Sequence, residues 1–486
     1  MRVLLSALAA IALSACASLS DRASASLAAP GLEGTRWGLV VTTMDGRELI
    51  AIRPNERFSP ASNTKLFTVA AAFHRLGDLT VPDPAMGTSV RLEAREGRPP
   101  DIVLVGGGDA MLIDAADCER DCLSDLADAV VANGITRIGA IIADDQLYPH
   151  QPWGYGWSQE DMIKRSGEPV SALTVNNNET MVVVRPAATA SQPAIVEWLE
   201  PTPWFPLLSD IETIEAIEGN EAGITVERVA KSSAIRVYGR VLAGGAAVNV
   251  PVAVDDPARV AALRFQRLLA ERGVEMGAVI AGYRRDVTSA DTDTKPRPHV
   301  IERQGVELAR LVPPPLIEDV TFLMKQSQNL HAELLLRRLG LIEGGGSTED
   351  GLSVVNAMLT EARAERFSWD FADGSGMSIY NRVTPRMVAN FLRWTSQQTW
   401  GEAFRATLPV GGVDGTLRRR FAGTSLEGRI SAKTGTLAGV NALSGFMTTR
   451  SGQTLIFSAF ANDRPPGADS TIVALDATLV EIAETN

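Results

Sequence analysis

The most informative segment of this chain reads Ser59-Pro60-Ala61-Ser62-Asn63-Thr64-Lys65-Leu66-Phe67-Thr68. Lys65 follows Ser62 by three residues, so at the start of a helix the amine and the hydroxyl share a face. A serine hydroxyl becomes a nucleophile only when a neighbouring base accepts its proton, and a lysine at this spacing can do so. The apolar residues 66–73 predict a buried helix that ends near Gly77. Taken alone, the pair is also explained by a helix start followed by a solvated lysine.

Two further motifs follow in the chain. Ser327-Gln328-Asn329 precedes an apolar run, and Lys433-Thr434-Gly435-Thr436 lies in a strand pattern. Alone, the first could be a helix cap, and the second could be a charged edge-strand residue beside a bulge glycine. The order Ser-x-x-Lys, Ser-x-Asn, Lys-Thr-Gly, each in a compatible local structure, is the motif set of the penicillin-recognising serine enzymes.

The chain resembles one branch of these enzymes, the D-alanyl-D-alanine carboxypeptidases/endopeptidases among the class C low-molecular-mass penicillin-binding proteins. Between Lys65 and Ser327 lie 261 residues, and members of this branch carry extra domains at that point. There are two departures, Ile379 where the family often has arginine, and Gln328 where it commonly has Asp or Asn. The supporting segments are Gly106-Gly107-Gly108-Asp109, Asp144-Asp145, Ser171-Ala172-Leu173-Thr174-Val175-Asn176, Asp373-Gly374-Ser375-Gly376-Met377-Ser378 and Asp414-Gly415-Thr416-Leu417.

The resemblance implies a role for each motif residue. Ser62 would attack the carbonyl between two D-alanines, with Lys65 as the base. Burial and the second cation, Lys433, would favour the neutral amine of Lys65. Ser327 would relay a proton to the leaving amine, and Asn329 would orient Lys65 and the substrate amide.

Lys433, Thr434 and Thr436 would receive the terminal carboxylate, and Gly435 would let the acyl chain approach the strand closely. The backbone N–H groups of Ser62 and Thr436 would form the oxyanion hole. Peptidoglycan stem peptides are the implied substrates, and β-lactams the implied inhibitors that acylate Ser62. Neither a cofactor nor a metal is expected.

The fold class expected is α/β of the α+β type, a β-lactamase/transpeptidase-like domain with a central antiparallel sheet. A hairpin around Asp45-Gly46 and three C-terminal strands would form the sheet. The C-terminal helix and the helix of Ser62 would cover its two faces. Residues 35–87 and 300–486 would build this catalytic domain. Residues 88–299 would form inserted accessory domains, mainly β, which are two in number and nested.

The N-terminus is predicted to be a lipoprotein signal peptide over residues 1–15. Leu13-Ser14-Ala15-Cys16 resembles a lipobox, so Cys16 would be acylated and residues 16–34 would form the lipid anchor and tether. Ala17 and Ser18 follow the cysteine, and by resemblance to the lipoprotein sorting rule the lack of an aspartate there favours the outer membrane over the inner. The chain would thus be lipid-anchored in the periplasm, at the outer membrane of a Gram-negative bacterium. An ordinary cleaved signal with a chance cysteine is the alternative.

Composition excludes some partners. The formal net charge of −12 argues against a nucleic-acid partner.

In an exported protein, Cys118 and Cys122 predict a local disulfide. The four histidines are scattered and form no ligand cluster with these cysteines, so no metal site is predicted. The oligomeric state, including a homo-oligomer, stays open.

Three alternatives for the function remain. A β-lactamase or an esterase uses the same residues, although the inserted region argues against the compact β-lactamase form. A non-catalytic peptidoglycan-binding lipoprotein would have a decayed site, whereas all the motif residues are present here. Within the peptidase reading, the sequence does not divide activity between D-Ala-D-Ala ends and D-Ala-meso-diaminopimelate cross-links.

Overall fold

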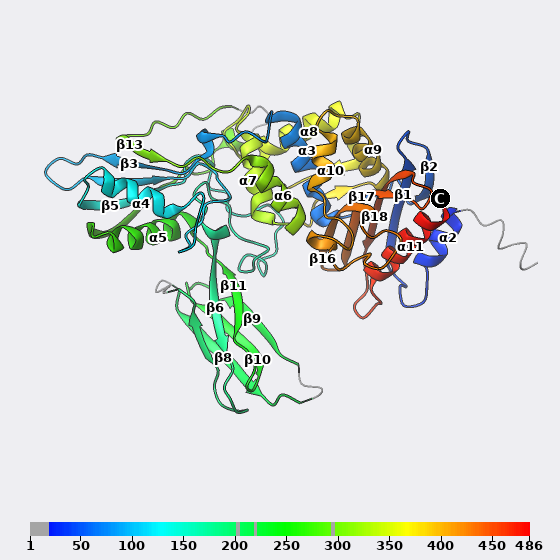
Figure 1. Ribbon diagram of the computed structural model, residues 1–486, viewed down its shortest axis with the longest axis horizontal. Helices are drawn as coiled ribbons and strands as arrows, with labels where there is room; N and C mark the ends of the chain where they lie inside the picture. The colour runs from blue at the N-terminus through cyan, green and yellow to red at the C-terminus, as the bar shows by residue number, and fades with distance from the viewer. Residues whose placement is uncertain (1–18, 201–204, 218–220, 293–296) are drawn as a thin grey trace, which may run out of the picture. The chain divides into compact units, whose positions relative to one another are not determined.

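The computed structural model describes residues 19–200, 205–217, 221–292 and 297–486. Within these residues the chain forms two compact units (Figure 1). The first unit comprises residues 19–80, 317–342 and 348–486, and the second comprises residues 81–316 and 343–347. The second unit therefore takes up a longer part of the chain than the insertion predicted at residues 88–299.

The first unit is built on a five-stranded sheet with the strand order β16-β17-β18-β1-β2. Every neighbouring pair in it is antiparallel, which confirms the predicted central sheet. The N-terminal hairpin turns at Asp45-Gly46, where Gly46 has φ +95°, a conformation that favours glycine. The strands are β1 (Arg36–Thr43), β2 (Glu48–Ile52), β16 (Ile430–Leu437), β17 (Val440–Thr448) and β18 (Thr454–Asn462).

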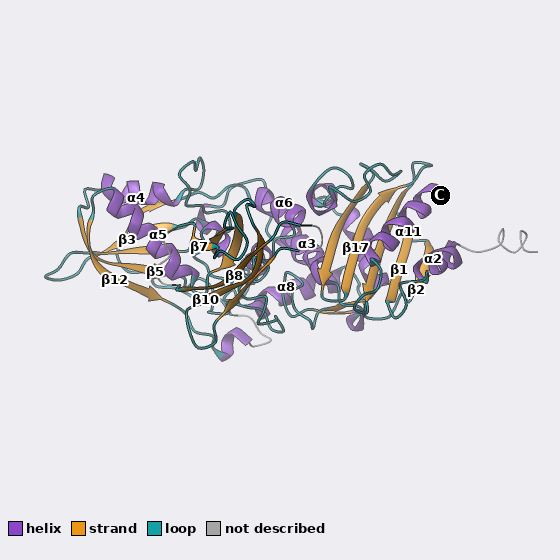
Figure 2. Cartoon of the chain, turned by 90° about the horizontal axis from the view of Figure 1, so that it is seen from below, coloured by secondary structure: helices purple, strands orange, loops and turns teal. Residues whose placement is uncertain are grey.

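Helices cover both faces of this sheet. On one face α11 (Thr471–Thr485) packs against β17, and it lies across the strands in Figure 2. On the other face α9 (Pro385–Ser396) packs against β18 and β1. The expectation that the helix of Ser62 would cover this face is therefore wrong in one respect. The 3₁₀ turn Ala61–Thr64 contacts β16 and β17, whereas the helix beyond it packs mainly among other helices.

That helix is α3 (Lys65–Arg75), and it is the centre of a helical layer. Its residues 66–72 are almost fully buried because α7 and α8 pack against it. The Phe67 ring lies 4.9 Å from Phe371 and 4.7 Å from Phe391, centroid to centroid. The other helices of this layer are α6 (Leu316–Gln326), α7 (Asn329–Gly340), α8 (Thr348–Glu361) and α10 (Gly401–Thr407), and the short strands β14 (Trp369–Asp370) and β15 (Arg382–Val383) pair beside them.

The predicted tether over residues 16–34 is wrong for nine of its nineteen residues. Residues Leu19–Leu27 form the helix α2, which packs against β2 and α11. Leu19, Ala23 and Leu27 recur every four residues and join the apolar cluster beneath the sheet. Because this spacing places them on one helical face, burial rather than composition determines the structure here.

The second unit contains a five-stranded mixed sheet with the order β12-β5-β4-β3-β13. Two helices that were not predicted within the insertion, α4 (Leu123–Ala132) and α5 (Pro257–Glu271), pack on it through residues such as Leu126 and Phe265. The strands are β3 (Ser89–Glu93), β4 (Asp101–Val105), β5 (Arg137–Asp144), β12 (Glu275–Tyr283) and β13 (Val306–Arg310).

Two three-stranded sheets complete the second unit, with the orders β11-β6-β7 and β8-β10-β9. Their inward side chains, including Val182, Val237 and Val252, form one apolar cluster. The strands are β6 (Glu179–Arg185), β7 (Ile195–Trp198), β8 (Leu207–Ile214), β9 (Gly223–Arg228), β10 (Ile235–Leu242) and β11 (Val248–Ala253).

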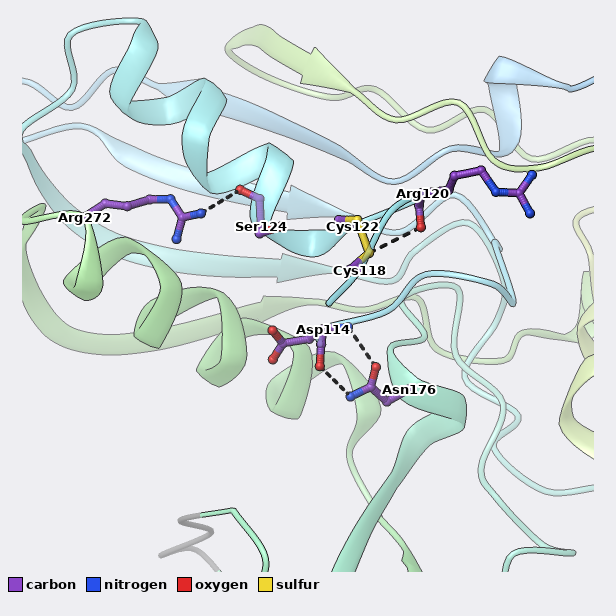
Figure 3. The surroundings of a disulfide bond; sticks show 7 residues. All are labelled: Asp114, Cys118, Arg120, Cys122, Ser124, Asn176 and Arg272. Carbon is purple, nitrogen blue, oxygen red and sulfur yellow. Dashed lines mark hydrogen bonds between the residues drawn. A yellow bond between two sulfur atoms is a disulfide. The ribbon is translucent and has the colours of Figure 1, made fainter. Parts of the chain in front are cut away.

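Cys118 and Cys122 are joined by a disulfide just before α4, with their Cα atoms 5.8 Å apart (Figure 3). Nearby, Asp114 is held through its backbone by Asn176, whose side-chain oxygen accepts from Asp114 N at 2.8 Å. In the described parts of the chain, no helix has both the length and the apolar character needed to cross a bilayer. Cys16 and the predicted signal peptide lie outside the described residues.

Candidate active site

Ser62 lies in the 3₁₀ turn Ala61–Thr64, immediately before α3. Ala61 has φ +45°, a left-handed conformation that is unfavourable for a residue with a Cβ atom. Backbone strain of this kind persists only where the surroundings hold it. Here the loop from Asp373 approaches so closely that a Cβ on Gly376 would lie 1.9 Å from the Ala61 carbonyl oxygen. The turn that presents Ser62 is thus packed tightly into one conformation.

Lys65 is completely buried, and its amine lies among oxygen acceptors. Nζ donates to Ser62 Oγ at 3.0 Å, to Asn329 Oδ1 at 2.5 Å and to the Ser375 carbonyl at 2.6 Å. Two of these partners, the Asn329 amide oxygen and the Ser375 carbonyl oxygen, can only accept hydrogen bonds, and both come from other parts of the unit. A neutral amine that keeps both of those bonds directs its lone pair at the Ser62 hydroxyl, which is the geometry a general base requires.

Ser327 and Asn329 lie in the tight connection between α6 and α7. Ser327 has φ +61°, and Asn329 is the first residue of α7. Between them, the Gln328 side chain caps α7 by accepting from His331 N at 3.4 Å. Gln328, the departure noted in this motif, therefore has a structural contact in the helix cap.

Lys433, on β16, contacts Ser327. Its Nζ donates to Ser327 Oγ at 2.7 Å and to the Thr434 carbonyl at 3.0 Å. The side chain is fully buried. Burial, and secondly the positive charge of Lys65, hold the pKa of Lys433 well below its ordinary value. Each lysine is thus hydrogen-bonded to one of the two serines, and the charge of Lys65 disfavours charge on Lys433.

Gly435 lets β16 lie directly against the Ser62 turn. A Cβ at this position would lie 2.7 Å from the Pro60 carbonyl oxygen and 3.1 Å from Ala61 Cβ. Asn63 closes the same contact, because its Nδ2 donates to the Lys433 carbonyl at 2.9 Å. The glycine expected to admit an acyl chain therefore also sets the distance between the strand and the serine.

A buried acidic pair supports the site: Asp373 begins one of the segments named from the sequence, whereas Glu333 was missed. Glu333 Oε1 accepts from Gly374 N at 3.0 Å and from Ser375 N at 2.8 Å. Asp373 accepts from Gly376 N at 2.9 Å and from Ser378 N at 2.6 Å. These bonds fix the loop whose Ser375 carbonyl accepts from Lys65.

One sequence signal could have found Glu333. It lies four residues after Asn329, on the same face of α7, inside an otherwise apolar run. Desolvation raises the pKa of Glu333 to about 7, with the charge of Asp373 adding to this and Arg337 opposing it.

Thr416 belongs to the supporting segment Asp414-Gly415-Thr416-Leu417, but the three motifs assign it no role. Its hydroxyl lies 2.8 Å from Thr434 Oγ1. Its turn is anchored by Lys325, whose Nζ donates to Asp414 Oδ2 at 2.6 Å. Thr436 is exposed on the same strand, and its hydroxyl accepts from Asn441 Nδ2 at 3.3 Å.

The structure thus places six predicted residues in two hydrogen-bonded groups and leaves others apart. Gly435 and Thr436 share the strand of Lys433, whereas the cysteine pair belongs to the second unit. Ile379, the other departure, is 58% exposed. Across the described residues no three His, Cys, Asp or Glu side chains gather where they could hold a metal ion. One group consists of Ser62, Lys65 and Asn329, and the other of Ser327, Lys433 and Thr434.

Comparisons with known proteins show the family of this chain. A family model described as the D-Ala-D-Ala carboxypeptidase 3 (S13) family matches residues 19–480. The chain is 33% identical over 474 residues to a D-alanyl-D-alanine carboxypeptidase of Actinomadura sp. (strain R39), which covers 94% of this chain and 82% of that protein.

Solved structures show the same fold. The crystal structure of penicillin binding protein 4 (dacB) from Haemophilus influenzae superposes with a TM-score of 0.80 at 22% identity, covering 95% of this chain and 98% of that one. The same protein complexed with a novel β-lactam gives a TM-score of 0.74 at 21% identity, with the same coverage. The family match over nearly the whole chain and the 33% identical relative show that this chain belongs to the D-Ala-D-Ala carboxypeptidase 3 (S13) family.

Proposed function

We propose that this chain, a serine D-Ala-D-Ala carboxypeptidase by its family, trims peptidoglycan stem peptides through an acyl-enzyme on Ser62. One observation carries the proposal: Lys65 Nζ lies 3.0 Å from Ser62 Oγ while Lys433 Nζ lies 2.7 Å from Ser327 Oγ. A nucleophile with its base, and a second hydroxyl with its own cation, together provide both proton transfers of an acyl transfer.

In the first step, the neutral amine of Lys65 accepts the Ser62 proton as Oγ attacks the D-Ala carbonyl. The proton then passes through the Ser327 hydroxyl to the leaving amine, and the C–N bond breaks to leave a Ser62 ester. Water attacks that ester with Lys65 accepting its proton; Lys65 then returns a proton to Ser62 Oγ as the ester C–O bond breaks and the product carboxylate leaves. Asn329 keeps Lys65 in place through the bond between its Oδ1 and Nζ.

The rest of the site would orient the substrate. Thr434, Thr436 and the cation of Lys433 would bind the carboxylate that follows the scissile bond. The backbone N–H groups of Ser62 and Thr436 would stabilise the oxyanion, and losing one such donor typically slows an enzyme about a hundredfold or more. β-Lactams would acylate Ser62 in the same way and inhibit the enzyme.

The test compares Ser62→Ala with Ser451→Ala, a control on the exposed turn after β17. We expect Ser62→Ala to lose both labelling by a fluorescent penicillin and D-alanine release from a pentapeptide, while the control keeps both. Labelling of Ser62→Ala at the wild-type rate would exclude Ser62 as the nucleophile. Rapid turnover of penicillin by the wild type, without D-alanine release, would instead favour a β-lactamase.

We also propose that D-Ala-meso-diaminopimelate cross-links are cleaved, because these too place a carboxylate on the carbon after the scissile amide. Mass spectrometry of purified peptidoglycan, before and after incubation, should show loss of pentapeptide and of cross-linked dimer. Persistence of the dimer with complete loss of pentapeptide would restrict the enzyme to carboxypeptidase activity.

We further propose that Cys16 carries a lipid that anchors the enzyme in the periplasm at the outer membrane. The lipobox pattern Leu13-Ser14-Ala15-Cys16 supports this. Metabolic labelling with a radioactive fatty acid should mark the wild type and not Cys16→Ser. Equal labelling of both proteins would show that Cys16 is not the acylated residue.

A further inference from the structure

The first unit contains an open cavity of about 370 Å³ beside the helix α10. Its volume falls in the range of about 300–1,000 Å³ that is usual for small-molecule sites. Apolar walls come from Val410 and Ala406, and polar groups come from Glu402, Arg405 and Ser431. None of these residues belongs to the contacts around Ser62. We refer to this cavity as the Arg405 pocket.

Arg405 is the unusual group in this pocket. It is half-buried, and its guanidinium carbon lies 5.0 Å from the ring centroid of Phe446, which is itself 1% exposed. Among the described residues, no hydrogen bond or ion pair is formed by its side chain. Two other arginines of the same unit differ, because Arg386 forks onto Glu48 and Arg420 onto Asp476.

A cation in this setting is costly without a counter-ion. Burial lowers the pKa of Arg405, with the charge of Glu402 opposing the effect only partly. The Phe446 ring holds the planar group from one side by cation–π attraction, so rotamer freedom is already reduced. A planar guanidinium held in this way presents its N–H groups in the geometry that a carboxylate accepts in two parallel bonds.

We propose that the Arg405 pocket binds a small amino acid, with the ligand carboxylate on Arg405 and the ligand ammonium near Glu402. Glu402 lines the same cavity one helical turn from Arg405, yet no ion pair joins them in the described structure. Opposite charges that line one cavity without pairing are complementary to a zwitterion. Ser431, on β16, offers a hydroxyl at the wall of the same pocket.

The test measures binding of D-alanine to the full chain by isothermal titration calorimetry, with D-alaninamide as the matched ligand that lacks the carboxylate. Arg405→Met is compared with Arg450→Met, which removes an exposed arginine after β17. We expect D-alanine to bind the wild type and Arg450→Met equally, and Arg405→Met at least about tenfold more weakly. D-alaninamide should bind none of them at the same concentrations.

D-alanine that binds around Ser62 as a reaction product would still bind to Arg405→Met, so this variant distinguishes binding there from binding in the Arg405 pocket. If that variant is unstable, Arg405→Lys keeps the charge, removes the fork, and should also weaken binding. Undiminished D-alanine binding by both variants, no binding by the wild type, or equal binding of D-alaninamide would each overturn the proposal. Since the readout is binding, it does not depend on the proposed catalysis.

Discussion

Replacement of Gly435 by alanine tests whether the spacing between β16 and the Ser62 turn sets the reaction rate. The added Cβ would lie 2.7 Å from the Pro60 carbonyl oxygen, whereas ordinary contact begins at 3.4 Å, so the two segments must separate by about 0.7 Å. Moving Asn63 Nδ2 and the Lys433 carbonyl apart from 2.9 Å by that amount gives about 3.6 Å, beyond hydrogen-bond range.

Two costs follow from this displacement. Overpacking and the lost hydrogen bond together should lower the free energy of unfolding by about 2–4 kcal/mol. A misplacement near 1 Å typically slows a positioned reaction by about a hundredfold, so acylation should fall by about tenfold to a hundredfold. The assay is the second-order rate of labelling by a fluorescent penicillin, together with urea unfolding.

A matched control comes from Gly282→Ala on β12, where the nearest atom to an added Cβ lies 3.7 Å away. We expect that variant to keep both the wild-type acylation rate and the wild-type stability. If Gly435→Ala acylates as fast as the control, close packing of the strand does not position Ser62, and the reasoning is refuted.

Three further predictions concern other parts of the molecule. The buried carboxyl of Glu333 has its pKa raised from 4.5 to about 7, so the folded state keeps this proton to higher pH than the unfolded state does. The free energy of unfolding should therefore fall by up to about 3 kcal/mol from pH 4.5 to 7. In urea titrations, Glu333→Gln should show a shallower dependence of this free energy on pH, and an unchanged dependence would contradict the prediction. Thr416→Val should lower kcat/KM about fivefold or more for a peptide with a free terminal carboxylate, because the Thr416 hydroxyl lies 2.8 Å from Thr434 Oγ1. Thr416→Ser retains the hydroxyl and should keep the wild-type kcat/KM. Equal kcat/KM values for the two variants would exclude a role for that hydroxyl. Replacing Cys118 and Cys122 by serine should cost only about 2 kcal/mol, because the closed loop is short, and a loss of the whole fold on denaturant titration would show a larger role.

The parts of the fold that sequence predicted are those with local signals. The hairpin at Asp45-Gly46 and the helix after Ser62 follow from turn chemistry and apolar periodicity within a few residues. By contrast, α2 has the alanine- and serine-rich composition of a linker, and it is helical because Leu27 and Ala23 bury against the sheet's apolar cluster. Only the presence of a surface to pack against distinguishes a helix from a linker in this segment.

The same division applies to the site. Sequence alone determined the chemical groups, since Ser62, Lys65, Ser327, Asn329 and the Lys433 strand occur in motifs whose residue types and order are readable from one chain. It could not determine that Glu333 supports the loop of Ser375, or that the Arg405 side chain forms no ion pair with any described residue. Those facts depend on which side chains meet across long sequence separations, and on how much water remains around them. Only the tertiary structure decides such contacts. Distance and desolvation, rather than residue type, determine the pKa values and which charged side chains form ion pairs.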